Sequence, residues 1–319
     1  MTSNRKWQQL FSHNPRFQYL ACNALSGAKL IMSLVSTRKI SAKGNTKFLF
    51  IVGSGRSGNT ILRRLLMSSG DIYIPPESYV LGQSVRSSLD MIGASWDDRV
   101  KLILSQFEYH PEFHTFGVTS LTEFARLAEQ YPPERQTLGD LIAGLYEWLA
   151  KEHIGRVSWL GDKTPLNTLS LGLMKSIFPK ARFLYIERDG IDVVHSYLVA
   201  KIYPEALQAG QRWLASRRAW LSFKSSIASQ HYAEVKYENL VRDPESEINR
   251  LLEHFNIPER QAECLNLGDV EMHEHHANVL SPPNPDSIGK GRREMDEGQK
   301  NKLRTMLNSE LVNAGYEKI

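Results

Sequence analysis

A glycine-rich turn between an apolar run and a helical pattern is the first feature of this sequence that could do chemistry. Residues 53–60 read GSGRSGNT and directly follow the apolar run 48–52. A turn of this kind at the start of a helix directs backbone N–H groups and the positive end of the helix dipole at one point, which suits a phosphate. It departs from the nucleotide-binding pattern G-x-x-x-x-G-K-[ST], because Asn59 stands at the lysine position and Arg56 lies inside the turn.

The missing lysine limits the ligand that this turn can hold. In P-loop kinases the lysine reaches the β- and γ-phosphates, and the following Ser/Thr binds Mg²⁺. Without it, a triphosphate loses its main counter-charge, and we expect Arg56 to neutralise a smaller anionic group. The motif alone leaves open a turn that only caps a helix. The predicted anion-binding residues are Gly53, Ser54, Gly55, Arg56, Ser57, Gly58, Asn59 and Thr60.

A second anion site is predicted after the apolar segment 181–187. Arg188 follows this segment directly, Asp189 is well placed to cap the next helix, and Ser196 lies about two turns along it. An arginine at a strand end and a serine on the following helix can both reach one phosphate. The adjacent His195 is predicted to be a packing or hydrogen-bonded residue rather than a catalytic one.

With both motifs in view, the chain resembles the sulfotransferases that use 3′-phosphoadenosine 5′-phosphosulfate (PAPS). In that family a P-loop-like turn binds the 5′-phosphosulfate, and a later arginine–serine pair binds the 3′-phosphate. GSGRSGNT is similar to the first motif in the form found in the Golgi and bacterial branches, which include tyrosylprotein and carbohydrate sulfotransferases. FPKARFLYIERDGIDVVHSY (178–197) is similar to the second motif, and the likeness covers about residues 47–315.

The resemblance implies further site residues. It implies that Tyr237 in VKYENL packs near the nucleotide and that Lys163 in GDKTP is presented to the active site. It also implies that Lys290 and Arg292, in SIGKGRR, close over the 3′-phosphate and adenosine. The chain departs from the family at Gly291, where a tryptophan or similar residue is frequent.

Catalysis in such a site is expected to rest on positioning and electrostatics, by analogy with phosphoryl transfer. Arg56 and the turn N–H groups would stabilise the leaving phosphate, and Lys163 the group in transfer. Glu77, in IPPES, follows the first strand–helix unit closely, and the resemblance makes it the general base. A solvated Glu77, or one paired with Arg56, stays an alternative. No metal is expected, and HEHH (273–276) is interpreted as a solvated loop.

The elements that must position these residues alternate between strands and helices. This alternation predicts an α/β fold, a P-loop-like doubly wound parallel sheet flanked by helices, in which ligands bind at the carboxyl ends of the strands. We expect an N-terminal helical extension and linker over 1–45 and one sulfotransferase domain over 46–319. Strands are predicted at 47–52, 157–165, 181–187 and 233–237, and helices at 58–69, 189–200, 205–229, 244–255 and 296–313, with 86–153 mostly helical.

Composition sets broad limits on partners and compartment. The 319 residues carry a net charge of +4, which suits an anionic ligand and is too mild to indicate nucleic acid. Cys22 and Cys264 form no C-x-x-C pair, so a reducing, cytoplasmic location is expected. The apolar stretch 17–36 shows no signal-peptide order, and it is interpreted as a packed helix, a surface-lying amphipathic helix or an anchor, so peripheral membrane contact stays open.

The acceptor is the least determined part of the function. We expect a carbohydrate or glycolipid hydroxyl, with a protein tyrosine or a small-molecule alcohol as alternatives. A P-loop nucleotide kinase and a non-catalytic nucleotide-binding protein are the rival functions, and a homodimer is left open. Stacking surfaces for a sugar could come from Trp96, Tyr109, Tyr131, Trp148 and Trp159.

Overall fold

A five-stranded parallel sheet forms the centre of the computed structural model, which describes residues 40–91, 94–260 and 284–319. The strands lie in the order β2-β3-β1-β4-β5. Their bounds are β1 Lys47–Gly53, β2 Ile72–Tyr73, β3 Trp159–Lys163, β4 Arg182–Glu187 and β5 Tyr232–Lys236. The three central strands are almost wholly buried, as expected for apolar strands covered on both faces. The predicted α/β doubly wound fold is confirmed.

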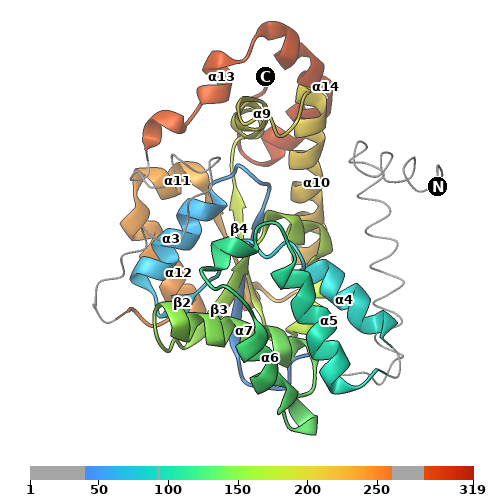
Figure 1. Ribbon diagram of the computed structural model, residues 1–319. Helices are drawn as coiled ribbons and strands as arrows, with labels where there is room; N and C mark the ends of the chain where they lie inside the picture. Colours follow the sequence, from blue (N-terminus) through green and yellow to red (C-terminus); the bar gives the residue numbers. More distant parts are fainter. Residues whose placement is uncertain (1–39, 92–93, 261–283) are drawn as a thin grey trace, which may run out of the picture.

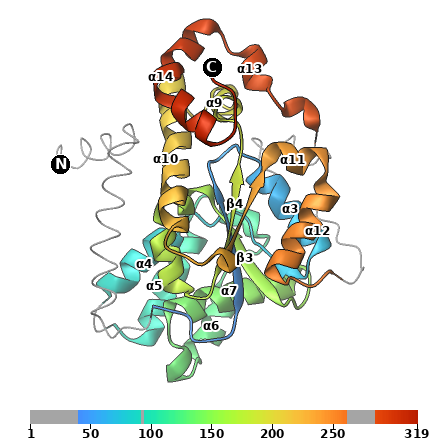
Figure 2. The same cartoon turned by 180° about the vertical axis from the view of Figure 1, so that it is seen from behind.

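Helices cover both faces of the sheet (Figures 1 and 2). On one side lie α3 Asn59–Ser69, α11 Tyr237–Arg242 and α12 Pro244–Phe255. On the other lie α4 Leu81–Asp90, α5 Trp96–Glu108 and α10 Ala206–Lys224. The remaining helices are α6 Thr122–Glu129, α7 Leu138–His153, α8 Leu171–Ile177, α9 Gly190–Val199, α13 Lys290–Glu294 and α14 Glu297–Asn313. Of these, α9, α13 and α14 gather beyond the carboxyl end of β4.

Strand register places the predicted site residues at one edge of the sheet. Ile51 of β1 pairs with Lys163 of β3, and Gly53 pairs with Ile186 of β4. The turn that follows β1 therefore lies between the end of β3 on one side and the segment after β4 on the other. The chain runs from β1 to β2 and β3 on one side and then crosses to β4 on the other side of β1, and doubly wound folds bind their ligands where the strand order reverses in this way.

One helix is shorter than expected from the sequence, and one short helix was not expected. The helix expected over 205–229 ends at Lys224, where the hydroxyls of Ser225 and Ser226 donate to the carbonyls of Ser222 and Phe223. Such local bonds compete with the helical pattern. The six-residue helix α11 was not expected, because it is too short to show a periodicity.

Residues expected to form a linker pack on the body of the domain. Ile40 is buried in the core, and the Ala42 N–H donates to the carbonyl of Ile177 at 2.7 Å. The Asp140 carboxylate accepts the N–H groups of Lys43 and Gly44. The compact body thus reaches back at least to residue 40, whereas segment 17–36, both cysteines and the HEHH cluster lie outside the described residues. Within the described ranges, no helix is long and apolar enough to cross a membrane.

Candidate active site

The glycine-rich loop, residues 53–58, adopts the tight turn predicted for it. Gly58 caps α3 with φ 94°, a left-handed value that suits glycine. A Cβ on Gly58 would lie 2.4 Å from the ring of Tyr237, so the ring closes directly over the loop. Arg56 also has a left-handed backbone, with φ 66°. The loop is therefore shaped both by glycine and by contacts from a residue far along the chain.

Asn59 has a different role from the one expected. Its side-chain amide donates to the carbonyl of Ser54 at 2.7 Å, so it turns back into the loop instead of facing a ligand. The Asn59 side chain is buried, and its Oδ1 has no hydrogen-bond partner among the described residues. The residue at the lysine position of the usual motif thus holds the loop shape, because its short amide reaches the loop backbone.

Arg56 joins the two predicted anion sites into one. Its Nε donates to the hydroxyl of Ser196 at 3.1 Å, and its carbonyl accepts from Arg188 at 3.1 Å. Burial lowers the pKa of the Arg56 guanidinium, and the positive charge of Arg188 acts in the same direction. Arg188 is buried and Arg56 is half-buried, and an anion placed between two such neighbouring guanidinium groups stabilises them, so this arrangement fits a phosphate or sulfate group.

The Arg188 guanidinium packs on an aromatic ring and donates to a backbone carbonyl near the C-terminal end of the chain, and one of its nitrogens has no hydrogen-bond partner among the described residues. Its guanidinium carbon lies 4.1 Å from the centre of the Tyr237 ring, and one terminal nitrogen donates to the carbonyl of Ser287. The Tyr237 hydroxyl hydrogen-bonds to the Ser287 hydroxyl at 2.7 Å. The Arg188 Nε is buried and has no hydrogen-bond partner among the described residues. An anionic ligand would satisfy it, which is the fit expected for the 3′-phosphate site.

The late basic loop contacts the same region through its backbone more than through its basic side chains. The N–H groups of Gly289 and Gly291 donate to the carboxylate of Asp192 on α9. Gly291 packs so tightly that a Cβ would lie 2.4 Å from the carbonyl oxygen of Ile191. The tryptophan that the resemblance would lead us to expect at this position would not fit here.

The two basic residues predicted from this loop have other partners. Arg292 donates to Asp189 at 2.7 Å and to the carbonyls of Glu317 and Lys318. The ammonium of the half-exposed Lys290 lies 3.9 Å from the Glu294 carboxylate. The structure does not bring either side chain onto the glycine-rich loop, and their contact with the donor stays a prediction.

On the opposite side of the loop, Lys163 joins Glu77 to Thr60. The Lys163 ammonium lies 2.6 Å from the Glu77 carboxylate and 3.1 Å from the Thr60 hydroxyl. The lysine side chain is 2% exposed and that of Glu77 is 14% exposed. Burial lowers the pKa of Lys163, and the Glu77 carboxylate opposes this shift. Glu77 is therefore not a solvated carboxylate, and Arg56 is not its sole partner, because it forms an ion pair with Lys163.

A buried network fixes the strand end that carries Lys163. The neighbouring Asp162 carboxylate accepts from Tyr146, Ser78 and Asn167 at 2.7–3.2 Å. Burial raises the pKa of Asp162, and the hydrogen bonds from its neighbours oppose the shift. Because Ser78 adjoins Glu77 in sequence, the network positions both members of the Glu77–Lys163 pair.

Tyr79 was not predicted, yet its ring lies beside Glu77. Its hydroxyl hydrogen-bonds to Glu77, and burial together with the Glu77 charge raises the pKa of the phenol. Its ring stacks on His110 with centroids 5.3 Å apart. The residue has a left-handed φ of 55°, and no periodic pattern in the sequence signals its position.

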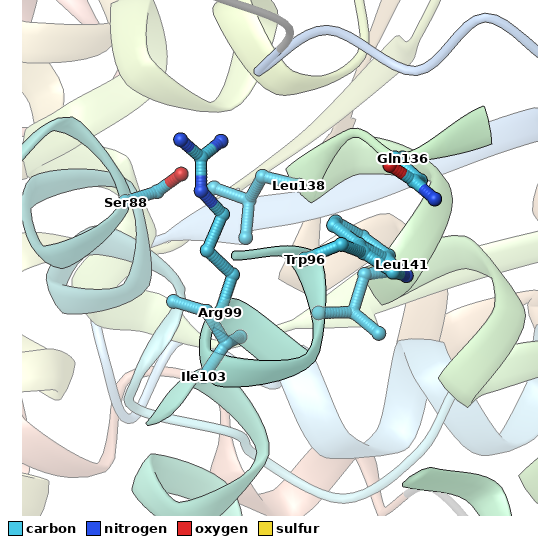
Figure 3. Close-up of a pocket in the computed structure, with 7 residues that line it drawn as sticks. All are labelled: Ser88, Trp96, Arg99, Ile103, Gln136, Leu138 and Leu141. Carbon is cyan, nitrogen blue, oxygen red and sulfur yellow. The ribbon is translucent and has the colours of Figure 1, made fainter. Parts of the chain in front are cut away.

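The other aromatic residues considered for the acceptor are mostly structural. Trp159 is buried in β3, Trp96 stacks with Tyr131, and Trp148 packs against Phe124. A small pocket beside Trp96 lies between α4, α5 and the start of α7 (Figure 3). None of the residues predicted for the donor or for catalysis lines it. His195 contacts Glu294 at 3.2 Å, in keeping with the hydrogen-bonded role expected for it.

Comparison with known proteins agrees with this geometry. The family model described as the sulfotransferase family matches residues 49–261, which include the glycine-rich loop, the Glu77–Lys163 pair and Arg188 with Ser196. This chain belongs to the sulfotransferase family. The resemblance seen in the motifs is thereby confirmed, and the family match favours a sulfotransferase over the P-loop kinase alternative.

Three curated relatives of this chain are all named protein-tyrosine sulfotransferases. The chain is 24% identical over 254 residues to protein-tyrosine sulfotransferase A of Caenorhabditis elegans, covering 77% of this chain and 60% of the relative. It is 24% identical over 292 residues to the protein-tyrosine sulfotransferase of Drosophila melanogaster, covering 88% and 51%. The zebrafish (Danio rerio) protein-tyrosine sulfotransferase 1 is 25% identical, with 84% and 69% covered. The chain thus spans about half to two thirds of these relatives.

Solved sulfotransferase domains share the fold. The sulfotransferase domain of the Synechococcus PCC 7002 olefin synthase superposes with a TM-score of 0.54 at 21% identity, covering 81% of this chain and 93% of that domain. The sulfotransferase domain from the curacin biosynthetic pathway gives 0.52 at 22% identity, covering 86% and 99%. At these identities the likeness supports the fold alone.

Proposed function

We propose that this protein transfers the sulfuryl group of PAPS to an acceptor hydroxyl, and that the acceptor is a protein tyrosine. The proposal rests on one observation, the charged and polar side chains that lie together around the glycine-rich loop. Arg56, Arg188 and Ser196 lie on one side of the loop, and Lys163 and Glu77 lie on the other. A basic anion site and a carboxylate–lysine pair thus face the two ends expected of a donor and an acceptor.

The residues that would bind PAPS are assigned from the basic groups around the loop and from the space that the Tyr237 ring leaves. The buried Arg188 Nε and the Ser196 hydroxyl would hold the 3′-phosphate, and the Tyr237 ring would limit the adenosine side of the site. The loop N–H groups and Arg56 would bind the 5′-phosphate. When bound, PAPS supplies the sulfuryl group and leaves as adenosine 3′,5′-bisphosphate, whose added negative charge these residues would stabilise.

At the acceptor end, Glu77 would take the proton of the attacking hydroxyl. General base catalysis of this kind typically contributes about 10²–10⁴-fold to the rate. The Lys163 ammonium contacts both Glu77 and Thr60 of the loop, so it would stabilise negative charge on the group in transfer while it orients the base. No step assigned to these residues requires a metal ion.

The tyrosine acceptor replaces carbohydrate as the favoured substrate class. The three relatives compared above are all named protein-tyrosine sulfotransferases. Among the aromatic residues considered for sugar stacking, Trp96 and Tyr131 stack on one another, Trp148 packs against Phe124, Trp159 is buried and Tyr109 is exposed. The residue beside the base is itself a phenol, Tyr79. Carbohydrate and small-molecule alcohols stay alternatives for the test to decide.

Two measurements test the proposed function. In a thermal-shift titration, adenosine 3′,5′-bisphosphate should raise the midpoint, because a ligand that binds only the folded state stabilises it. Stabilisation by ATP–Mg²⁺ alone would contradict the assignment. In a transfer assay with ³⁵S-labelled PAPS, label should enter an acidic tyrosine-containing peptide and not its phenylalanine counterpart. Label in methyl glucoside but not in the peptide would restore the carbohydrate hypothesis.

A further inference from the structure

The protein carries a phenol of its own on the carboxylate assigned as general base. The Tyr79 hydroxyl hydrogen-bonds to Glu77, and the Tyr79 ring lies nearly parallel to His110, with 15° between the planes. An acceptor tyrosine would need the same two contacts. Its hydroxyl must lie within hydrogen-bond reach of the base, and its ring requires an apolar or aromatic face.

The backbone at Tyr79 has a conformation that its surroundings must stabilise. Its φ of 55° is uncommon for a bulky residue, and such conformations cost about 1–3 kcal/mol unless the surroundings stabilise them. The residue is also 40% exposed, so little core packing depends on it. The hydrogen bond to Glu77 and the stack on His110 are therefore the contacts that fix it, and both would be available to a competing ligand.

We propose that Tyr79 occupies the position of the acceptor phenol in the acceptor-free enzyme and is displaced when the acceptor tyrosine binds. The proposal rests on the proposed function, because it takes Glu77 as the base. It deepens that function by naming the ligand class of the acceptor site. The site accommodates a phenol whose hydroxyl meets Glu77 and whose ring lies against His110, and Tyr79 is a built-in competitor for it.

A competitor within the chain lowers the apparent affinity for the true acceptor. The apparent dissociation constant equals the intrinsic one divided by the fraction of molecules in which the position is free. Tyr79→Phe keeps the ring and its stack on His110 but removes the hydrogen bond to Glu77. Tyr79→Gly removes the ring, and glycine adopts a φ of 55° without strain, so the local fold is expected to persist.

The test is calorimetric titration of the full chain, saturated with adenosine 3′,5′-bisphosphate, with N-acetyl-tyrosinamide as the phenol probe. Both variants should bind the probe more tightly than the wild type, by roughly tenfold for Tyr79→Phe, the usual effect of losing one competing hydrogen bond. Equal or weaker binding in both variants would overturn the proposal. Methyl glucoside serves as the non-phenolic control, and phenol-like affinity for it would also overturn the proposal.

Kinetics separate a displaced competitor from a residue that merely orients the base. If Tyr79 competes with the acceptor, Tyr79→Phe lowers the acceptor KM and leaves kcat close to that of the wild type. If Tyr79 instead positions Glu77, kcat falls with KM unchanged, which would contradict the proposal.

Failure of the underlying function would look different. A wild-type chain that does not bind adenosine 3′,5′-bisphosphate refutes the proposed function. Titration with the phenol probe in the absence of nucleotide then still compares the wild type with the Tyr79 variants. Tighter binding by the variants would support Tyr79 as the occupant of a phenol site, and unchanged binding would overturn it.

Discussion

Replacing Glu77 with glutamine tests the centre of the proposed site, because it removes one charge of a buried pair and keeps the size of the side chain. The Lys163 ammonium is 2% exposed and lies 2.6 Å from the Glu77 carboxylate. Removing one partner of a buried ion pair typically costs about 3–5 kcal/mol. We therefore expect a large loss in the free energy of unfolding at neutral pH, together with a loss of transfer activity.

The free energy needed to remove the proton from Lys163 sets an upper limit to this loss of stability. A buried ammonium without its carboxylate can release its proton, and from an ordinary pKa of 10.5 this costs about 5 kcal/mol at pH 7 and about 2 kcal/mol at pH 9. In the variant, the unfolded chain then keeps a proton on Lys163 at pH values where the folded chain has lost it. The stability of Glu77→Gln should therefore rise with pH relative to the wild type.

Urea denaturation at pH 7 and pH 9 measures this difference. We expect a deficit of about 3 kcal/mol at pH 7 that shrinks to about 2 kcal/mol or less at pH 9. Glu294→Gln is the matched control, because Glu294 is half exposed and its loss should change stability by no more than about 0.5 kcal/mol. A deficit that does not change with pH would show that Lys163 keeps its proton in the folded variant, and it would refute the expected release of that proton.

The same variant tests the assignment of the base. If Glu77 accepts the proton of the acceptor, kcat should fall by about 10²–10⁴-fold. Binding of adenosine 3′,5′-bisphosphate should change little, since Glu77 lies on the acceptor side of the loop. A kcat within threefold of the wild type would refute Glu77 as the base, whatever the outcome for stability.

Three further variants probe the donor site and its support. Gly58→Ala should weaken adenosine 3′,5′-bisphosphate binding at least tenfold, because its Cβ meets the Tyr237 ring at 2.4 Å and φ is 94°; Gly172→Ala, with nothing within 4 Å, is the control that should bind normally. Arg188→Ala should weaken adenosine 3′,5′-bisphosphate about tenfold or more and spare adenosine 5′-phosphosulfate, and equal losses would contradict its assignment. Asp162→Asn should lower the free energy of unfolding by about 2–4 kcal/mol, because buried donors lose a carboxylate acceptor; a urea midpoint equal to that of the wild type would refute the network.

The parts of the site that follow from local sequence were predictable. The glycine-rich turn after an apolar strand and Arg188 after another both lie at strand ends, and parallel strands end at one edge of a sheet. Their convergence is therefore a consequence of the fold class. Glu77 and Lys163 could be placed near this edge, although their contact depends on the register of β2 with β3.

The parts that sequence could not give depend on side chains that fold back or on contacts between distant segments. Asn59 turns into its own loop, although its position in the motif suggested a ligand contact. Tyr79, which lies beside Glu77, has a left-handed backbone that is uncommon for a bulky residue and that we did not predict from the sequence. Ser287 meets Tyr237 across 50 positions of the chain, and a single sequence shows no pairing signal at that distance.

The bond between the carbonyl of Arg56 and the guanidinium of Arg188 bears on how the enzyme would tell its donor from abundant nucleotides. The loop backbone and the second arginine are mechanically linked, so a group that orders one also orders the other. By thermodynamic reciprocity, occupancy at the 3′ end and at the 5′ end should then favour each other. A nucleotide without a 3′-phosphate would lose its contact with Arg188, and it would also lose the ordering of the loop that this contact brings. The difference in binding free energy between PAPS and such a nucleotide would therefore exceed the contribution of the direct phosphate contact alone.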